Sequence, residues 1–173
     1  FETVGMADSI QSDDYSMQLA PFAPETVNKI AAVLREKRLD ALVGIVNPLD
    51  INPAADDDAH ARIAAILACD PGVDAVVLGL DPLSPAMHTL AETDVPAFDL
   101  HAEGSIATLL PEVVSQSDKP IIGVIDGGRL YDPLRDALMA GGVAVFPVCD
   151  RAVAALAQYI QARLHADMLR GWA

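Results

Sequence analysis

Four short polar clusters hold the residues of this sequence whose types and positions could do chemistry, and each cluster follows directly on an apolar run. The clusters are Asn47-Pro48-Leu49-Asp50, Asp81-Pro82-Leu83-Ser84-Pro85, Asp126-Gly127-Gly128-Arg129 and Pro147-Val148-Cys149-Asp150. In open α/β sheets, ligands bind at the carboxyl ends of the strands, where the loops lead into helix N-termini. Acids at such points could bind a substrate, but Asp and Ser there more often cap a helix or form a turn. Both roles stay open for each acid.

Gly127 and Gly128 are the most suggestive residues of these clusters. Because glycine has no Cβ atom, the pair lets a ligand or a second backbone approach closely. A tight turn from a strand into a helix explains the same pair without any ligand. Both interpretations fit the same two residues.

The histidines show no arrangement typical of metal binding or of nucleophilic catalysis. His60 and His165 lie within expected helices, where we expect solvated side chains, and His88 and His101 have no partner at metal-ligand spacing. Walker and dinucleotide-binding glycine patterns do not occur either. We therefore expect no catalytic residue, no metal site and no cofactor site formed by this chain alone.

One string resembles a cofactor motif. Residues 99–104 (DLHAEG) match the D-x-H-x-x-G pattern of cobalamin-binding domains, in which the histidine binds cobalt. In those domains the pattern follows the first strand, whereas here it follows 95–98, a late and short run that contains a proline. We interpret the match as a coincidence.

Composition narrows the function classes that remain. The chain has 173 residues, which fits one domain, and 52% are hydrophobic but only 5% aromatic, so Ala, Val, Leu and Ile must form the core. The formal net charge of −14 argues against nucleic acid or anionic membrane surfaces as main partners. No apolar run is long enough to span a bilayer and no signal-peptide pattern opens the chain, which favours a cytoplasmic location. Cys69 and Cys149 lie in apolar surroundings, which predicts small buried thiols rather than a disulfide.

Short β-type runs alternate with helical patterns along most of the chain. Strands are expected at 73–80, 120–125 and 143–148, with a further apolar run at 41–46, and helices at 24–38, 55–69, 104–116, 131–140 and 151–168. The run at 73–80 has almost no polar residue, and a strand that is apolar on both faces implies helices on both sides of a parallel sheet. The order of these elements predicts an α/β fold with a doubly wound, mostly parallel sheet of the flavodoxin type.

The start of the chain departs from this pattern. We expect a helix at 2–11 and a short strand at 15–20, but no strand precedes the first helix, although a doubly wound sheet normally opens with one. We therefore expect a sheet that lacks its first strand, in a chain that begins at Phe1 as a piece of a longer protein. Phe1, Val4 and one side of 73–80 would then lose their cover. Either a shifted strand fills the gap or the chain associates with a second copy.

A series of turns and runs in this sequence resembles one family. The series comprises 19–26 (LAPFAPET), 47–51 (NPLDI), 70–78 (DPGVDAVVL), 119–128 (KPIIGVIDGG), 142–147 (GVAVFP) and 151–156 (RAVAAL). In this order and spacing it resembles the second flavodoxin-like CoA-ligase domain of NDP-forming acyl-CoA synthetases, relatives of succinyl-CoA synthetase. The resemblance covers nearly the whole chain, 1–173, as one such domain. Residues 1–10 resemble the helix that follows the family's Gly-rich strand and loop, so that strand and loop are missing.

The resemblance implies a role in converting an acid, CoA and a nucleoside triphosphate into acyl-CoA, a nucleoside diphosphate and phosphate. The family runs this reaction through a phosphorylated histidine and divides it among CoA-binding, phosphohistidine-bearing and ATP-grasp domains, which are the expected partners. CoA and ATP or ADP with Mg are the expected cofactors of the full-length enzyme. No histidine here has the family's Ser-His-Thr-Gly-like surroundings, which points to the second ligase domain. We therefore expect the chain to be inactive alone.

The resemblance also implies which loops face substrate and phosphate, because helix N-termini of the paired ligase domains stabilise the phosphohistidine. The expected residues are Asn47, Asp50, Ser84, Gly127 and Gly128. Asn47 and Asp50 match the family's Asn-Pro-x-Asp turn, and residues 81–85 correspond to a Gly-containing loop of succinyl-CoA synthetase. Here that loop carries two prolines, which lack N–H donors, and Asp81, which repels phosphate. This departure supports a second hypothesis, a catalytically silent ligase-like module for binding or assembly.

Overall fold

The sheet has three parallel strands, and each lies within a run that the sequence predicts. The computed structural model of the chain describes residues 2–171. Strands β1 (Val76–Gly79), β2 (Ile121–Val124) and β3 (Ala144–Phe146) pair in the order β1-β2-β3, with Val76 opposite Ile121 and Ile122 opposite Ala144. All four residues of β2 are buried, whereas β1 is only half-buried over Val77–Gly79. β2 is therefore the centre of the sheet and β1 one of its edges.

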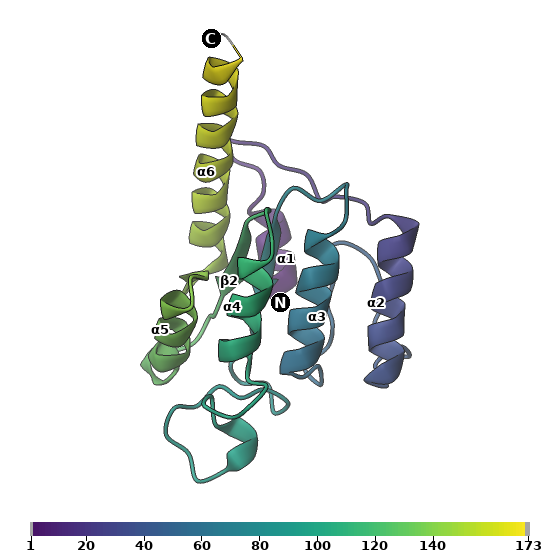
Figure 1. Cartoon of the computed structure of the whole chain (residues 1–173), viewed down its shortest axis with the longest axis vertical. Helices are drawn as coiled ribbons and strands as arrows, with labels where there is room; N and C mark the ends of the chain where they lie inside the picture. Colours follow the sequence, from purple (N-terminus) through teal and green to yellow (C-terminus); the bar gives the residue numbers. More distant parts are fainter. Residues whose placement is uncertain (1, 172–173) are drawn as a thin grey trace.

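Helices connect the strands and cover both faces of the sheet (Figure 1). They are α1 (Glu2–Asp8), α2 (Pro24–Glu36), α3 (Asp57–Ala68), α4 (Ile106–Ser115), α5 (Asp132–Ala140) and α6 (Cys149–Arg170), with short 3-10 turns at Pro96–Phe98 and Arg129–Tyr131. Helices α3, α4 and α5 pack on one face in a core of aliphatic residues such as Ile106 and Leu134. Helix α6 packs on the other face, where Met6 of α1 joins Ile122, Ala152 and Leu156. Helix α2 packs on α3, outside the sheet layers.

This arrangement confirms the predicted fold class, an α/β fold whose parallel sheet is flanked by helices, consistent with a flavodoxin-like fold that lacks a strand. Side chains cap the α3 and α4 helices: Asp56 accepts a hydrogen bond from the N–H of Ala59 (2.9 Å), and Ser105 from that of Ala107 (3.2 Å). No helix of residues 2–171 is long and apolar enough to cross a membrane.

Two expected β-type runs do not form strands. Residues 15–20 make only an isolated bridge, between Ser16 and Gln11, and residues 41–46 form turns and coil in which Leu42 is 63% and Val46 66% exposed. A strand is stabilised by hydrogen bonds to a neighbouring strand, and neither run lies next to one. The alternative of a shifted strand in the gap was also wrong for the described residues, since the sheet has no fourth member there. Val4 is 59% exposed, and Phe1 lies outside the described residues.

Four side chains test the burial expected from the sequence. Both cysteines are free, as predicted, but Cys69 is exposed and Cys149 only half-buried, because they lie at the end of α3 and the start of α6. His165 is exposed, as predicted. His60 is buried, and the prediction of a solvated side chain was wrong, because this face of α3 packs against the rest of the molecule.

Candidate functional site

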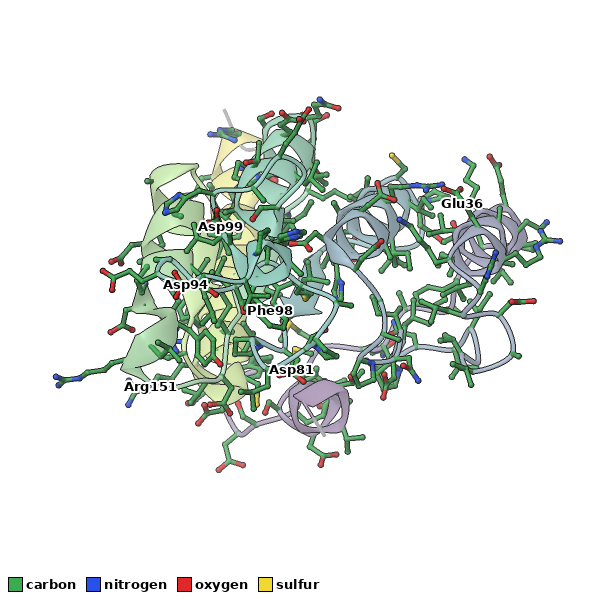
Figure 2. The ribbon with its side chains drawn as sticks, turned by 90° about the horizontal axis from the view of Figure 1, so that it is seen from below. Glu36, Asp81, Asp94, Phe98, Asp99 and Arg151 are labelled. Carbon is green, nitrogen blue, oxygen red and sulfur yellow. The ribbon has the colours of Figure 1, made fainter. Side chains whose placement is uncertain are left out.

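A cavity of about 1210 Å³ runs along the free edge of β1. At the carboxyl end of β1 its lining includes the polar residues Asn47, Asp50, His60, Asp81, Ser84 and Asp126. Figure 2 views the molecule from this end and shows Asp81 between Glu36 and Arg151, which lie toward opposite sides. The loops that follow the strands and precede α3 therefore form the mouth of the cavity, at the position where open α/β sheets bind ligands.

Three of the five residues expected at the site line this cavity, namely Asn47, Asp50 and Ser84. Gly127 and Gly128 are not among its lining residues, although Asp126 next to them is. The structure therefore brings two of the four polar clusters, and one residue of a third, to the same cavity.

Asn47 and Asp50 organise their own loop. The Asn47 Nδ2 amide donates to the carbonyl of Ala20 (2.9 Å), which ties the loop to the segment before α2, and the Asn47–Pro48 peptide is cis. The Asp50 carboxylate accepts from the N–H of Asn52 (3.0 Å) and is exposed. Asn52 has a positive φ of 72°, which asparagine tolerates better than most residues. One oxygen of Asp50 is thus used in a turn, and the carboxylate still faces the cavity.

Ser84 and Asp81 hold the loop after β1 in shape. The Ser84 hydroxyl is buried, donates to the carbonyl of Pro53 (2.7 Å) and accepts from the N–H of Ala86 (3.2 Å). The Asp81 carboxylate accepts from the N–H of Leu83 (2.9 Å) within an exposed turn. Ser84 therefore links the loop after β1 to the loop before α3. Its hydroxyl proton is engaged in the bond to Pro53 and is not available to a ligand.

The two glycines have different surroundings. A Cβ atom on Gly127 would lie 2.7 Å from the Tyr131 ring and 3.0 Å from Pro82, so the backbone at this point has room only for glycine. Gly128 has a φ of −68° and nothing within 4 Å of where its Cβ would lie. The buried Arg135 donates to the carbonyls of Ile125 and Gly127 and pairs with Asp132. Gly127 thus serves local packing, whereas Gly128 is exposed on an open surface.

His60 is the residue of this site that sequence reasoning missed. Its ring Nδ1 lies 2.9 Å from the carbonyl of Asp56 and donates to it, so Nε2 is the unprotonated nitrogen of the neutral ring. Burial lowers the pKa of His60 and favours this neutral form. Nε2 has no partner among the described residues, and the ring lines the cavity. The helical spacing of His60 with Ile63 and Leu67 was the signal that could have placed it on a buried face.

A second pair, Asp57 and His88, links the loops behind the site. The Asp57 side chain is 3% exposed and accepts from the main-chain N–H (3.2 Å) and ring Nδ1 (2.8 Å) of His88. It also accepts from the N–H of Ile106, the first residue of α4, at 2.6 Å. No sequence signal could have found this cluster, because its members are 31 and 49 residues apart.

These contacts leave little at the mouth that could bind an anion. The first turns of α3 and α4 have N–H groups bonded to the chain's own Asp56, Asp57 and Ser105. The mouth carries Asp50, Asp81 and Asp126, and the one Lys or Arg among the described lining residues is Arg163 of α6. Carboxylates without nearby cations repel phosphate.

No family model matches this sequence, and no curated protein does. Solved structures do match. The dinucleotide-forming acetyl-coenzyme A synthetase 1 of Ca. Korarchaeum cryptofilum aligns over 99% of this chain and 33% of its own, at 20% identity, with a TM-score of 0.67 without ligand and 0.66 with phosphate and ADP. The protein PH0766 of Pyrococcus horikoshii OT3 aligns over 88% of this chain and 31% of its own, at 18% identity and a TM-score of 0.66.

The fold is shared with part of these proteins. At such low identity the similarity shows the fold alone, and the chain spans about a third of the length of each matched structure.

Proposed function

We propose that residues 1–173 form the second ligase domain of an NDP-forming acyl-CoA synthetase and support chemistry that partner domains carry out. The observation that carries this proposal is the alignment of 99% of the chain with a dinucleotide-forming acetyl-coenzyme A synthetase. The turns at 47–51, 70–78 and 119–128 resemble the same family independently. According to this proposal, the substrates of the complete enzyme are an acid, CoA and a nucleoside triphosphate, and the enzyme is cytoplasmic.

The residues of this domain do not suit the phosphate groups of CoA, a nucleotide or a phosphohistidine. Asp50, Asp81 and Asp126 face the mouth, and one N–H group in the first turn of α3 and two in that of α4 are bonded to the chain's own side chains. We therefore assign no chemical step to this chain. CoA, nucleotide, Mg and the phosphorylated histidine belong to the partner domains of this proposal, and Asn47, Asp50 and Ser84 shape a surface that those domains contact.

One experiment tests the assignment. The isolated chain and the complete polypeptide that contains it are incubated with radiolabelled ATP, and separately with acetate, CoA and ATP. We expect no label on the isolated chain, and both acid-labile label and acyl-CoA formation with the complete polypeptide. Stoichiometric acid-labile label on a histidine of the isolated chain would contradict the proposal.

The second candidate is a catalytically silent module for binding or assembly. Its specific support is the same acidic mouth, whose carboxylates repel phosphate. The two candidates differ in the rest of the polypeptide: an enzyme needs a CoA-binding Rossmann domain, a Ser-His-Thr-Gly-like segment and an ATP-grasp region. A complete polypeptide that folds, contains none of these and forms no acyl-CoA would favour the module.

A further inference from the structure

His60 presents a hydrogen-bond acceptor that the chain itself does not use. Its side chain is only 6% exposed, and its Nδ1 donates to the carbonyl of Asp56 (2.9 Å), so Nε2 of the neutral ring is an acceptor. Every fully buried side-chain nitrogen or oxygen of the described residues has a hydrogen-bond partner. Nε2 has none and therefore opens into the cavity, whose lining includes His60. A donor for this nitrogen can approach only from the cavity.

Carboxylates surround this acceptor. Burial lowers the pKa of His60, and among the opposing influences is the charge of Asp81, which places that carboxylate near the ring. Asp126 follows β2, whose carboxyl end lies beside that of β1, and Asp50 lines the same mouth. All three carboxylates are exposed, and Asp50 and Asp81 each use only one oxygen in a turn. The mouth therefore offers hydrogen-bond acceptors with a negative charge.

The chemistry of the mouth selects one class of ligand. Carboxylates without nearby cations repel an anion. Among residues 2–171 no group of three His, Cys, Asp or Glu side chains is arranged to hold a metal ion, so the acids do not converge as metal ligands must. An organic cation with N–H donors suits both the carboxylates and the histidine nitrogen. Apolar side chains line the cavity beside these groups, among them Ile63 and Met87, and an aliphatic stem can pack against them.

We propose that the mouth of the cavity binds an aliphatic diamine or polyamine. One ammonium group donates to Nε2 of His60 and pairs with Asp81, and the aliphatic stem packs against Ile63 and Met87. A second ammonium group pairs with Asp50 or Asp126, because three carboxylates exceed the charge of one ammonium. The proposal does not rest on the function proposed above, since neither CoA nor a nucleotide takes part in it.

Calorimetric titration of the 173-residue chain with 1,4-diaminobutane tests the proposal. The titration is made at about 0.15 M salt, where the Debye length of about 8 Å screens attraction by the net charge of −14. We expect saturable binding of one diamine. 1-Aminobutane has the same stem with one charge and should bind about two- to fivefold more weakly, because one exposed ion pair is lost. 1-Butanol, which has the stem without a charge, should not bind.

Two substitutions of His60 separate its two nitrogens. His60→Asn keeps a nitrogen at the position of Nδ1, which can still donate to the Asp56 carbonyl, but removes the acceptor Nε2. We expect diamine binding to weaken at least about tenfold, because a hydrogen bond to a charged group is lost. His60→Gln places a carbonyl oxygen near the position of Nε2 and should bind within about threefold of the unsubstituted chain. Thermal melts followed by circular dichroism show whether both variants fold.

A second pair of variants tests the carboxylates. Asp81→Asn should weaken diamine binding about two- to fivefold. The matched control is Asp94→Asn, which makes the same change of charge at an exposed acid that does not line the cavity, and its binding should be unchanged. If His60→Asn does not fold, nitrogen NMR of the unsubstituted chain decides instead. The ring signal of His60 should then shift on titration with the diamine, while that of the exposed His165 stays in place.

Four outcomes would overturn the proposal. They are the lack of saturable diamine binding, unchanged binding by a folded His60→Asn variant, equal weakening by Asp81→Asn and Asp94→Asn, and an unmoved ring signal of His60 at saturation. A further comparison separates a free amine from a lysine side chain of a partner domain, which carries the same ammonium group. Nα-acetyl-lysine methylamide should bind more weakly than the diamine. Binding at least as tight as that of the diamine would assign the site to a lysine and contradict the proposal.

Discussion

The replacement of Asp57 by Asn is the most informative perturbation of this fold. The carboxylate is 3% exposed and joins three parts of the molecule: α3, the loop after β1 through His88, and the start of α4 through Ile106. In the Asp57→Asn variant the remaining side-chain carbonyl oxygen can still accept from Ile106, but the new amide NH₂ faces the main-chain N–H of His88. Two donors then meet, and the partly buried N–H of His88 keeps only the remaining carbonyl oxygen, which lies 3.4 Å away.

The magnitude follows from these contacts. A hydrogen bond to a charged group is worth about 1.5–3 kcal/mol, and both the N–H and the ring Nδ1 of His88 lose such a bond, so we expect a loss of about 3 kcal/mol in the free energy of unfolding. For a chain of this length that corresponds to about 6–12 °C in Tm. The matched control is Asp58→Asn. Asp58 neighbours Asp57, but its side chain is 45% exposed and pairs with Lys37 and Arg62 at the surface, and we expect about 0–1 kcal/mol.

Urea unfolding followed by circular dichroism measures both variants. We also expect faster hydrogen exchange at the Ile106 amide in Asp57→Asn and an unchanged rate in Asp58→Asn. A double-mutant cycle with His88→Ala should give a coupling energy of at least about 0.5 kcal/mol. Equal effects of the two Asn variants on unfolding would refute the reasoning that this buried carboxylate holds the loops together.

Four further expectations concern individual residues. Gly127→Ala should destabilise the chain by about 1–3 kcal/mol through steric overlap, whereas Gly128→Ala should stay within about 0.5 kcal/mol in thermal melts, and equal effects would show that the backbone adjusts freely. In the complete polypeptide Gly128→Val should lower acyl-CoA formation while the isolated variant stays folded, and unchanged turnover would limit this residue to a local turn. Ser84→Ala should cost about 1–2 kcal/mol in urea unfolding, and no loss would mean that water replaces its bond to a carbonyl. The pKa of Asp70 is lowered, mainly by hydrogen bonds from a threonine hydroxyl and two backbone N–H groups, and its folded pKa lies below the unfolded value. Its stabilisation is present above the unfolded pKa near 3.8 and is lost as the pH falls through the folded pKa, so Asp70→Asn should flatten the acid limb of a stability–pH curve.

The sequence by itself determined the parts of the fold that depend on local patterns. The three strands fall within the expected runs at 73–80, 120–125 and 143–148, because an uninterrupted apolar run between turn residues needs burial on both faces. The helices lie within a few residues of the expected ranges, since their caps and apolar spacing are local. The lack of an opening strand was also visible in the order of the elements. The sequence also showed the acidic, proline-containing loop at 81–85, whose composition argues against phosphate binding by this loop.

Only the tertiary structure decided what depends on neighbours far along the chain. Residues 15–20 and 41–46 have β-type patterns but no adjacent strand, and a strand without a partner leaves its backbone unpaired. Gly127 and Gly128 look alike in the sequence, and only the positions of Tyr131 and Pro82 show that one of them has no room for a side chain. The cavity along β1 likewise exists because α1, α3 and α6 close its two faces while its edge stays unpaired. Such features depend on contacts between residues that are far apart in the sequence, and no local pattern of residues predicts them.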